Sequence, residues 1–148
     1  MYRLGHGWRI VFLIFIAAGI VPMGGCGWWV GEPERRASAF VETLVREPTQ
    51  FETLQGFMAQ TPGVDVLAFT NEPPMRVALE YLRAKHRGGT GLDFSAFETA
   101  RPNMDSRRIA VRVRVGDARP ANDEVVLLLD LERESGGVWL VTQASVMP

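Results

Sequence analysis

The residue of this sequence best suited to acid–base chemistry is His86. It is one of two histidines among 148 residues, and the other lies near the N-terminus, ahead of an apolar run. A histidine that meets a carboxylate in a pocket can act as a general base, so His86 with Asp65 or Asp93 would give an enzyme or a small-ligand site. However, His86 stands between a lysine and an arginine near the expected end of a helix, where interaction with the helix dipole is a sufficient role for it.

The other candidate side chains indicate no metal or covalent centre. A Ser-His-Asp triad would have to use the same His86, and Cys26 is the single cysteine, which excludes a disulfide within the chain. A zinc site would lack a second thiol, and the carboxylates do not have the spacing of a calcium loop. We interpret Asp65, Asp93 and Glu98 as solvated acids. The sequence therefore implies no cofactor, and it favours a non-enzymatic domain.

The first 26 residues have the order of a secretory signal peptide. Arg3 and Arg9 are followed by an apolar run from Ile10 to Val21 and then by small residues up to Cys26. The motif MGGC at 23–26 resembles the lipobox of bacterial lipoproteins, with methionine where leucine is usual. The resemblance implies that a diacylglyceride is linked to the Cys26 sulfur by a thioether and that the chain is then cut just before Cys26, so that lipid, including palmitate, anchors the protein to the membrane.

Two alternatives remain open for this segment. The apolar run is shorter than the roughly 20 residues that cross a bilayer, but extending it from Trp8 to Val30 would give an uncleaved anchor that includes Pro22 and several glycines. The other alternative is an ordinary signal peptide with a chance cysteine. In each case the N-terminal arginines stay inside and the rest of the chain is exported to the periplasmic side. Gly27 after the cysteine favours the outer membrane over the inner one.

Beyond Cys26 the chain is mildly acidic and long enough for one domain. All 17 acidic residues and 14 of the 16 basic ones lie in this part, so a nucleic-acid partner is not expected. We divide the chain into a signal segment, 1–26, a short linker with two tryptophans, 27–32, and a single domain, 33–148. The partners implied are membrane lipid through Cys26 and a protein of the cell envelope.

Helical periodicity predicts three helices in the first half of the domain. The first runs from Pro33 to Glu47 and carries a regular apolar stripe. Thr49 and Glu52 form a capping box for a second helix, which a Thr-Pro-Gly turn closes. The third is capped by Asn71 and runs to about Lys85.

The second half changes to the alternation of β-strands. Residues 108–115, 124–132 and 138–146 predict an antiparallel meander of three strands, with a Ser-Gly-Gly turn before the last. Residues 64–70 are expected to form a brief strand, and residues 92–102 a short helix or an irregular segment. Helices that precede strands predict an α+β fold, in which about three helices pack on one face of a curled antiparallel sheet.

This order of elements resembles the nuclear-transport-factor-two-like, or cystatin-like, cone fold. The residues that carry the resemblance are the helical stripes 37–45 and 75–82 and the closing segment 137–141, GVWLV. In that family the cone interior binds small ligands, hosts acid–base chemistry or is filled with side chains. Two hypotheses follow: a membrane-tethered, non-enzymatic interaction module, which we favour, and a cone-fold enzyme or small-ligand binder that uses His86.

Arg108, Arg112 and Arg114 share one face of the first strand of the meander, and Asp130 and Glu132 share a face of the next. We favour the interpretation of a solvated face crossed by ion pairs. In the alternative, Arg112 and Arg114, which lie furthest from the two acids, bind an acidic partner or lipid headgroups.

Overall fold

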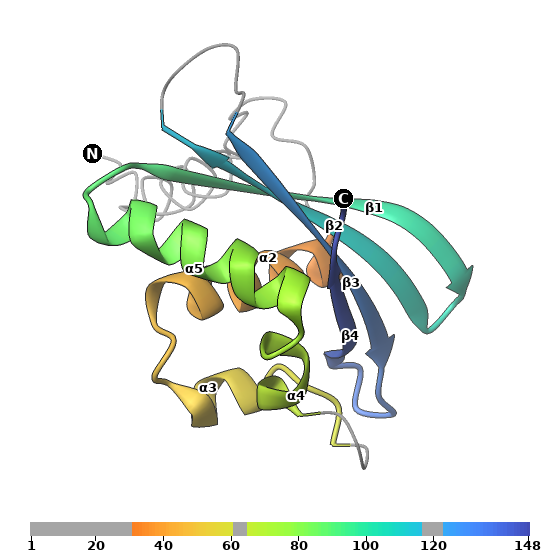
Figure 1. Ribbon diagram of the computed structural model, residues 1–148. Helices are drawn as coiled ribbons and strands as arrows, with labels where there is room; N and C mark the ends of the chain where they lie inside the picture. Colours follow the sequence, from red (N-terminus) through yellow and green to blue (C-terminus); the bar gives the residue numbers. More distant parts are fainter. Residues whose placement is uncertain (1–30, 61–64, 117–122) are drawn as a thin grey trace, which may run out of the picture.

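The computed structural model describes residues 31–60, 65–116 and 123–148. The expected signal segment, Cys26 and the linker up to residue 30 lie outside this part of the chain. The elements are α2 (Glu32–Arg46), α3 (Phe51–Gln55), α4 (Val66–Thr70), α5 (Pro73–Arg87), β1 (Leu92–Asn103), β2 (Ser106–Val115), β3 (Glu124–Arg133) and β4 (Trp139–Val146). Figure 1 shows the helices gathered on one side of the sheet, which confirms the α+β class. Within the described ranges no helix has the length and apolar character needed to cross a membrane.

Helix α2 supplies the centre of the core. Its buried residues recur at helical spacing and are at most 1% exposed: Ala37, Phe40, Val41, Leu44 and Val45. A proline lies in the first turn, where its missing N–H breaks no helical hydrogen bond. The ring of Phe40 also lies 5.8 Å from the ring of Phe57 and 5.9 Å from that of Phe69, measured between centroids. The predicted first helix is therefore confirmed, and it joins the sheet to the shorter helices.

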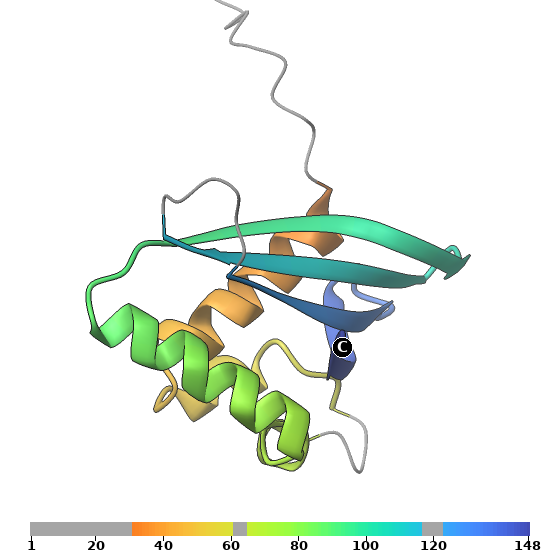
Figure 2. The ribbon, with the colours of Figure 1, turned by 45° about the horizontal axis from the view of Figure 1, so that its top comes forward.

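The four strands form an antiparallel meander in the order β1-β2-β3-β4. Alternation directs Ile109, Val111 and Val113 of β2 toward the helices, and the leucines at 127, 129 and 131 of β3 lie beside them in the core. Gly137, with a φ of 84°, donates its N–H to the Glu134 carbonyl at 2.8 Å and closes the turn before β4. The predicted three-strand meander is confirmed as β2, β3 and β4. Figure 2 shows the resulting two layers, with the helices on one face only.

Residues 64–70 were expected to form a strand, and this prediction is wrong. Residues 66–70 form helix α4, because the Asp65 carboxylate accepts the Leu67 N–H at 2.9 Å and caps the helix. Val66 and Phe69 are three residues apart, so both reach the core from one side of this helix. A short apolar run fits a strand and a helix equally well, and here the cap decides.

Residues 92–102 form strand β1, so the expected short helix or irregular segment is also wrong. The strand extends the sheet beyond β2, with Phe94 opposite Val113 and Ala96 opposite Val111. Two register shifts interrupt the pairing between Glu98 and Asn103. These bulges hide the alternation in the second half of the strand.

The two expected helix caps differ from the structure as well. Helix α3 begins at Phe51 after Gln50, which makes no side-chain cap, so Thr49 does not form the predicted capping box with Glu52. Asn71 ends helix α4 and does not start α5, which begins at Pro73. The fixed φ of a proline suits the first turn of a helix, so Pro73 determines the start of α5 more strongly than the nearby Asn71 does.

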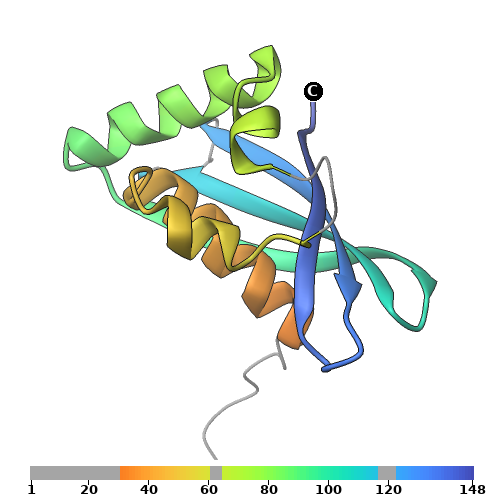
Figure 3. The same ribbon diagram turned by 90° about the horizontal axis from the view of Figure 1, so that it is seen from below.

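The expected curled sheet and cone are wrong. The sheet is open, because β1 and β4 are its two edges and do not pair with each other. Four strands are too few to close on themselves, and the side chains of α2 and α5 fill the side of the sheet that a cone would enclose. Figure 3, seen from below, shows these helices in front of the sheet.

Arg36 connects helix α2 to the two segments beyond its N-terminal half. Its Nε donates to the Trp139 carbonyl at 3.2 Å, and its Nη2 donates to the Gly56 carbonyl at 2.6 Å. The guanidinium also lies 4.3 Å from the centre of the Phe57 ring. One side chain therefore holds the α3–α4 connection and β4 against α2.

Arg83 makes the equivalent connection at the other end of α2. Its Nε and Nη2 donate to the Leu44 carbonyl at 3.0 and 2.8 Å, which satisfies a carbonyl in the last turn of the helix. Burial lowers the pKa of Arg83, and the charge of nearby Arg87 lowers it further. The guanidinium stays charged at neutral pH and fixes α5 to α2.

We predict that Leu44→Ala lowers the free energy of unfolding by about 2–5 kcal/mol, because Leu44 is 1% exposed at the helix–sheet interface. Leu67→Ala is the matched control, since Leu67 is 50% exposed on α4. Urea denaturation of a fragment that begins at Gly31 measures both. Equal effects of the two substitutions would show that the packed face of α2 is assigned wrongly.

Candidate interaction surface

The structure does not bring the predicted catalytic residues together. His86 is half-buried in the last turn of α5, and among the described residues no hydrogen bond or ion pair joins its ring to a carboxylate. Asp65 caps helix α4 instead. Asp93 lies on β1, with its Oδ2 3.7 Å from Nη2 of Arg114. In the described ranges no three His, Cys, Asp or Glu side chains are grouped closely enough to hold a metal ion.

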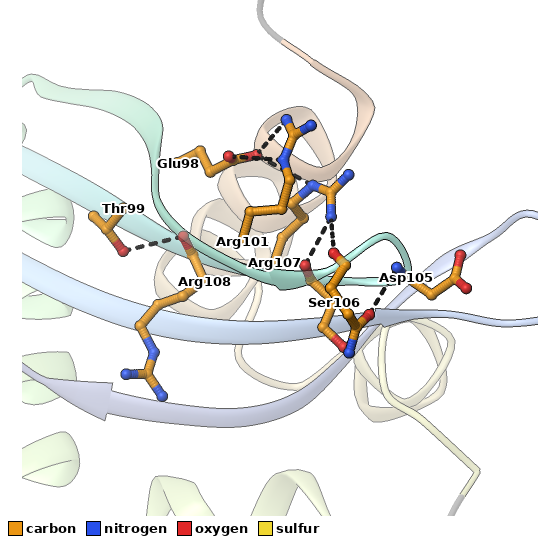
Figure 4. A network of polar contacts seen from close by, with 8 residues as sticks. Glu98, Thr99, Arg101, Asp105, Ser106, Arg107 and Arg108 are labelled. Atoms are coloured by element: carbon orange, nitrogen blue, oxygen red, sulfur yellow. Dashed lines mark hydrogen bonds and ion pairs between the residues drawn. The ribbon is translucent and has the colours of Figure 1, made fainter.

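Glu98, the third candidate acid, belongs to a polar network at the β1–β2 hairpin (Figure 4). Its carboxylate accepts from Nε and Nη2 of Arg101 at 3.1 Å, and its Oε2 lies 3.2 Å from Nε of Arg107. The hydrogen bond to Glu98 raises the pKa of Arg101. Arg107 also stacks over the Trp139 ring at 5.0 Å. Glu98 therefore fixes the hairpin and is no isolated solvated acid.

The face of the sheet opposite the helices carries a different set of side chains, which we call the outer face. The pairing of β1, β2 and β3 sets them in transverse rows: Phe97–Ala110–Leu128, with Ala100–Arg108–Asp130 on one side of it and Ser95–Arg112–Val126, followed by Asp93–Arg114–Glu124, on the other. No described helix covers this face, as Figure 2 shows. An apolar row therefore lies between two rows that carry arginine.

Each of the three arginines of the outer face is paired with a carboxylate. Arg108 donates from Nε and Nη2 to both oxygens of Asp130, at 2.7 and 2.9 Å, and this hydrogen bonding raises the pKa of Arg108. Nε of Arg112 lies 3.2 Å from Oε1 of Glu124. The expected approach of Asp130 to the arginines is confirmed. Arg112 and Arg114 are further from Asp130 than Arg108 is, as expected, but they have Glu124 and Asp93 beside them, so an acidic ligand would have to compete with these two carboxylates.

The apolar row is the part of this surface that the sequence did not identify. Phe97 is 42% exposed, and the guanidinium of Arg112 lies 5.4 Å from the centre of its ring. Leu128 of the same row is half-buried, and so is Val126 of the neighbouring row. The signal was present in the sequence, since Leu-Asp-Phe-Ser-Ala at 92–96 alternates as a strand does.

Comparison with known proteins adds one similarity. No family model matches this chain. A cell division protein, FtsQ of Roseobacter litoralis, is 32% identical to it over 118 residues. The alignment covers 71% of this chain and 36% of FtsQ, so the chain spans about a third of the length of this relative.

This similarity contradicts the resemblance to bacterial lipoproteins, because the protein that the chain matches is a cell division protein and not a lipoprotein. The lipobox match depended on four residues, with methionine at the position that usually holds leucine. An apolar run followed by small residues is a general feature of export segments. Lipid and palmitate on Cys26 therefore lose their support. The preference for the outer membrane is lost too, because it required a lipidated cysteine before Gly27.

We predict that replacing Arg112 and Arg114 together with glutamine lowers the free energy of unfolding by less than about 2 kcal/mol. Each exposed ion pair contributes roughly 0.2–1 kcal/mol. Arg36→Gln is the comparison variant, and it costs more because a guanidinium bound to two carbonyl oxygens is lost. Thermal and urea denaturation of the Gly31 fragment measure the difference. A larger loss in the double variant than in Arg36→Gln would contradict this assignment.

Proposed function

We propose that this protein is a non-enzymatic interaction module of the cell envelope, which binds a protein partner in cell division. The observation that carries the proposal is the apolar row Phe97–Ala110–Leu128 on a sheet face that no described helix covers. An exposed aromatic residue among half-buried apolar ones, rimmed by paired charges, is typical of a protein-binding surface. The similarity of the chain to part of FtsQ supports cell division as the process.

The sequence supports a location on the exported side of the inner membrane. Arg3 and Arg9 precede the apolar run, which holds the N-terminus in the cytoplasm and the rest of the chain outside it. In this proposal the N-terminal apolar segment, and not a lipid, tethers the protein to the inner membrane. The linker expected at 27–32 then ends before Glu32, where α2 begins, and the rest of the chain forms a single domain that works close to the membrane surface.

The outer face would bind a partner mainly through Phe97. Its ring is rigid and apolar, and it lies in the same row as Leu128 with Ala110 of β2 between them, so a partner that spans the row removes both from water. The guanidinium of Arg112 lies over this ring, 5.4 Å from its centre, and pairs with Glu124, so a partner would meet it as a polar group beside the apolar row. Charges at a rim change association rates and partner choice more than affinity.

We predict that a photocrosslinkable phenylalanine analogue at position 97 captures a cell division protein in growing cells. The same analogue at Phe51, which is 52% exposed on α3, is the matched control and should capture no such protein. Mass spectrometry of the ultraviolet-dependent adducts identifies the neighbours. Adducts that are the same from both positions, or only lipid adducts from position 97, would contradict the proposal.

The same experiment decides the role of the arginines. If the variant with glutamine at both 112 and 114 retains the adducts from position 97, Arg112 and Arg114 only keep this face hydrated and are not part of the binding surface. If the adducts disappear while the domain stays folded, Arg112 and Arg114 belong to the binding surface.

A further inference from the structure

Strand β1 presents an unpaired backbone edge. It pairs with β2 and with no other described strand. The Gly116 N–H donates to the Gly91 carbonyl at 2.8 Å, which fixes the hydrogen-bonding phase of this antiparallel pair. Hydrogen-bonded pairs recur at every second residue of an antiparallel pair, so Asp93 and Ser95, two and four residues after Gly91, exchange hydrogen bonds with β2. The N–H and C=O groups of Phe94 and Ala96 therefore point away from β2, toward the open edge.

Helix α2 forms a wall beside this edge. A groove of about 630 Å³ lies between the two elements, and its lining includes Ser38 and Ala39 of α2 and Phe94 and Ala96 of β1. At this point the helix contributes the small side chains of Ser38 and Ala39, with the charged side chains of Arg35 and Glu42 one turn before and one turn after them. Phe94 provides an apolar floor. The groove therefore has room for another main chain next to the free hydrogen-bonding groups of β1.

The opposite edge of the sheet, strand β4, is partly covered by another segment of the chain. Residues Phe57 to Ala59 run beside β4, where the Val141 N–H donates to the Phe57 carbonyl at 2.8 Å and the Ala59 N–H donates to the Val141 carbonyl at 2.9 Å. The chain thus covers part of the β4 edge with an extended segment of its own. Unprotected edge strands are templates for another strand, and within the described residues β1 has no such cover.

We propose that the groove between α2 and β1 binds an extended segment of a partner protein, which adds to the sheet beside β1. The inference rests on the proposed function as a protein-binding module, but it concerns a surface other than the outer face. The added strand donates to and accepts from the main chain of Phe94 and Ala96, in the mode of β-strand addition. Its central side chains face Phe94 and Ala39, so small or β-branched residues fit there, while polar residues suit the two ends of the groove beside Arg35 and Glu42.

The register shift after Glu98 limits the length of this site. Regular pairing of β1 with β2 extends from Leu92 to Glu98, so the edge offers an ordered set of groups only over that part. The occupant is therefore a short segment, and main-chain hydrogen bonds supply most of its affinity.

The test uses the full chain in lipid nanodiscs and a fluorescent peptide of alternating threonine and valine with a lysine at each end. A second peptide carries N-methyl groups on the amides of one edge, which keeps the side chains but removes the donors. We expect the first peptide to bind and to slow amide hydrogen exchange at Phe94 and Ala96. We expect the affinity of the methylated peptide to be lower by about tenfold or more.

Two variants of the protein locate the site. Ala39→Arg fills the groove from an exposed position of α2 and should weaken peptide binding about tenfold or more, whereas Ala84→Arg, the same change on exposed α5, should not. Ala96→Pro removes only the N–H that faces the groove and should weaken binding as well. Circular dichroism checks that each variant is folded.

The inference is overturned if both peptides bind equally, if Ala39→Arg has no effect, or if slowed exchange appears at the β4 edge instead. Light scattering that shows a dimer held by β1 would also overturn it, because the occupant would then be a second copy. These results are separable from the crosslinks at position 97: peptide binding at β1 without division-protein adducts from Phe97 would reject the proposed function alone.

Discussion

The structure depends on the burial of one face of helix α2 against one face of the sheet. Phe40, Val41 and Leu44 are almost fully shielded from water there, opposite the valines and leucines of β2 and β3. Removing apolar surface from water contributes about 25 cal/mol per Å², and no other contact in the described structure joins so many elements. Because the helices cover only this face, the sheet has a second face that is available for binding. The packing of the helices on one face of the sheet therefore both stabilises the domain and leaves the outer face exposed.

The sequence predicted the elements whose patterns are long and regular. The stripe of α2 and the alternation of β2, β3 and β4 were both correct, since each extends over enough residues for its period to be unambiguous. The failures lie in short or interrupted segments. Residues 66–70 form a single helical turn decided by the Asp65 cap, and β1 loses its alternation at the bulges after Glu98. The cone prediction failed for a different reason. It assumed a strongly curled sheet, and the alternation of apolar and polar residues does not encode the curvature of a sheet.

The candidate site was only partly predictable. The sequence placed Arg108, Arg112 and Arg114 on one face and Asp130 near them, and the structure agrees. The carboxylates beside Arg112 and Arg114 come from Glu124 and Asp93, and no local sequence pattern fixes the strand register that brings them there. Phe97 was missed because its strand was missed. His86, the residue whose chemistry attracted attention first, lies at the end of α5 without a carboxylate partner among the described residues. The residues that the proposed function uses are thus defined by sheet pairing, which the sequence reveals only indirectly.

In the function proposed above, the open outer face around Phe97 holds this protein at the machinery of cell division. Fluorescence imaging of the full chain, fused at its C-terminus, in growing cells measures this directly. We predict that the fusion concentrates at division sites and that Phe97→Glu disperses it around the envelope, while the chain stays folded and exported. A wild-type fusion that is spread evenly around the envelope, or a Phe97→Glu fusion that still concentrates at division sites, would contradict the claim.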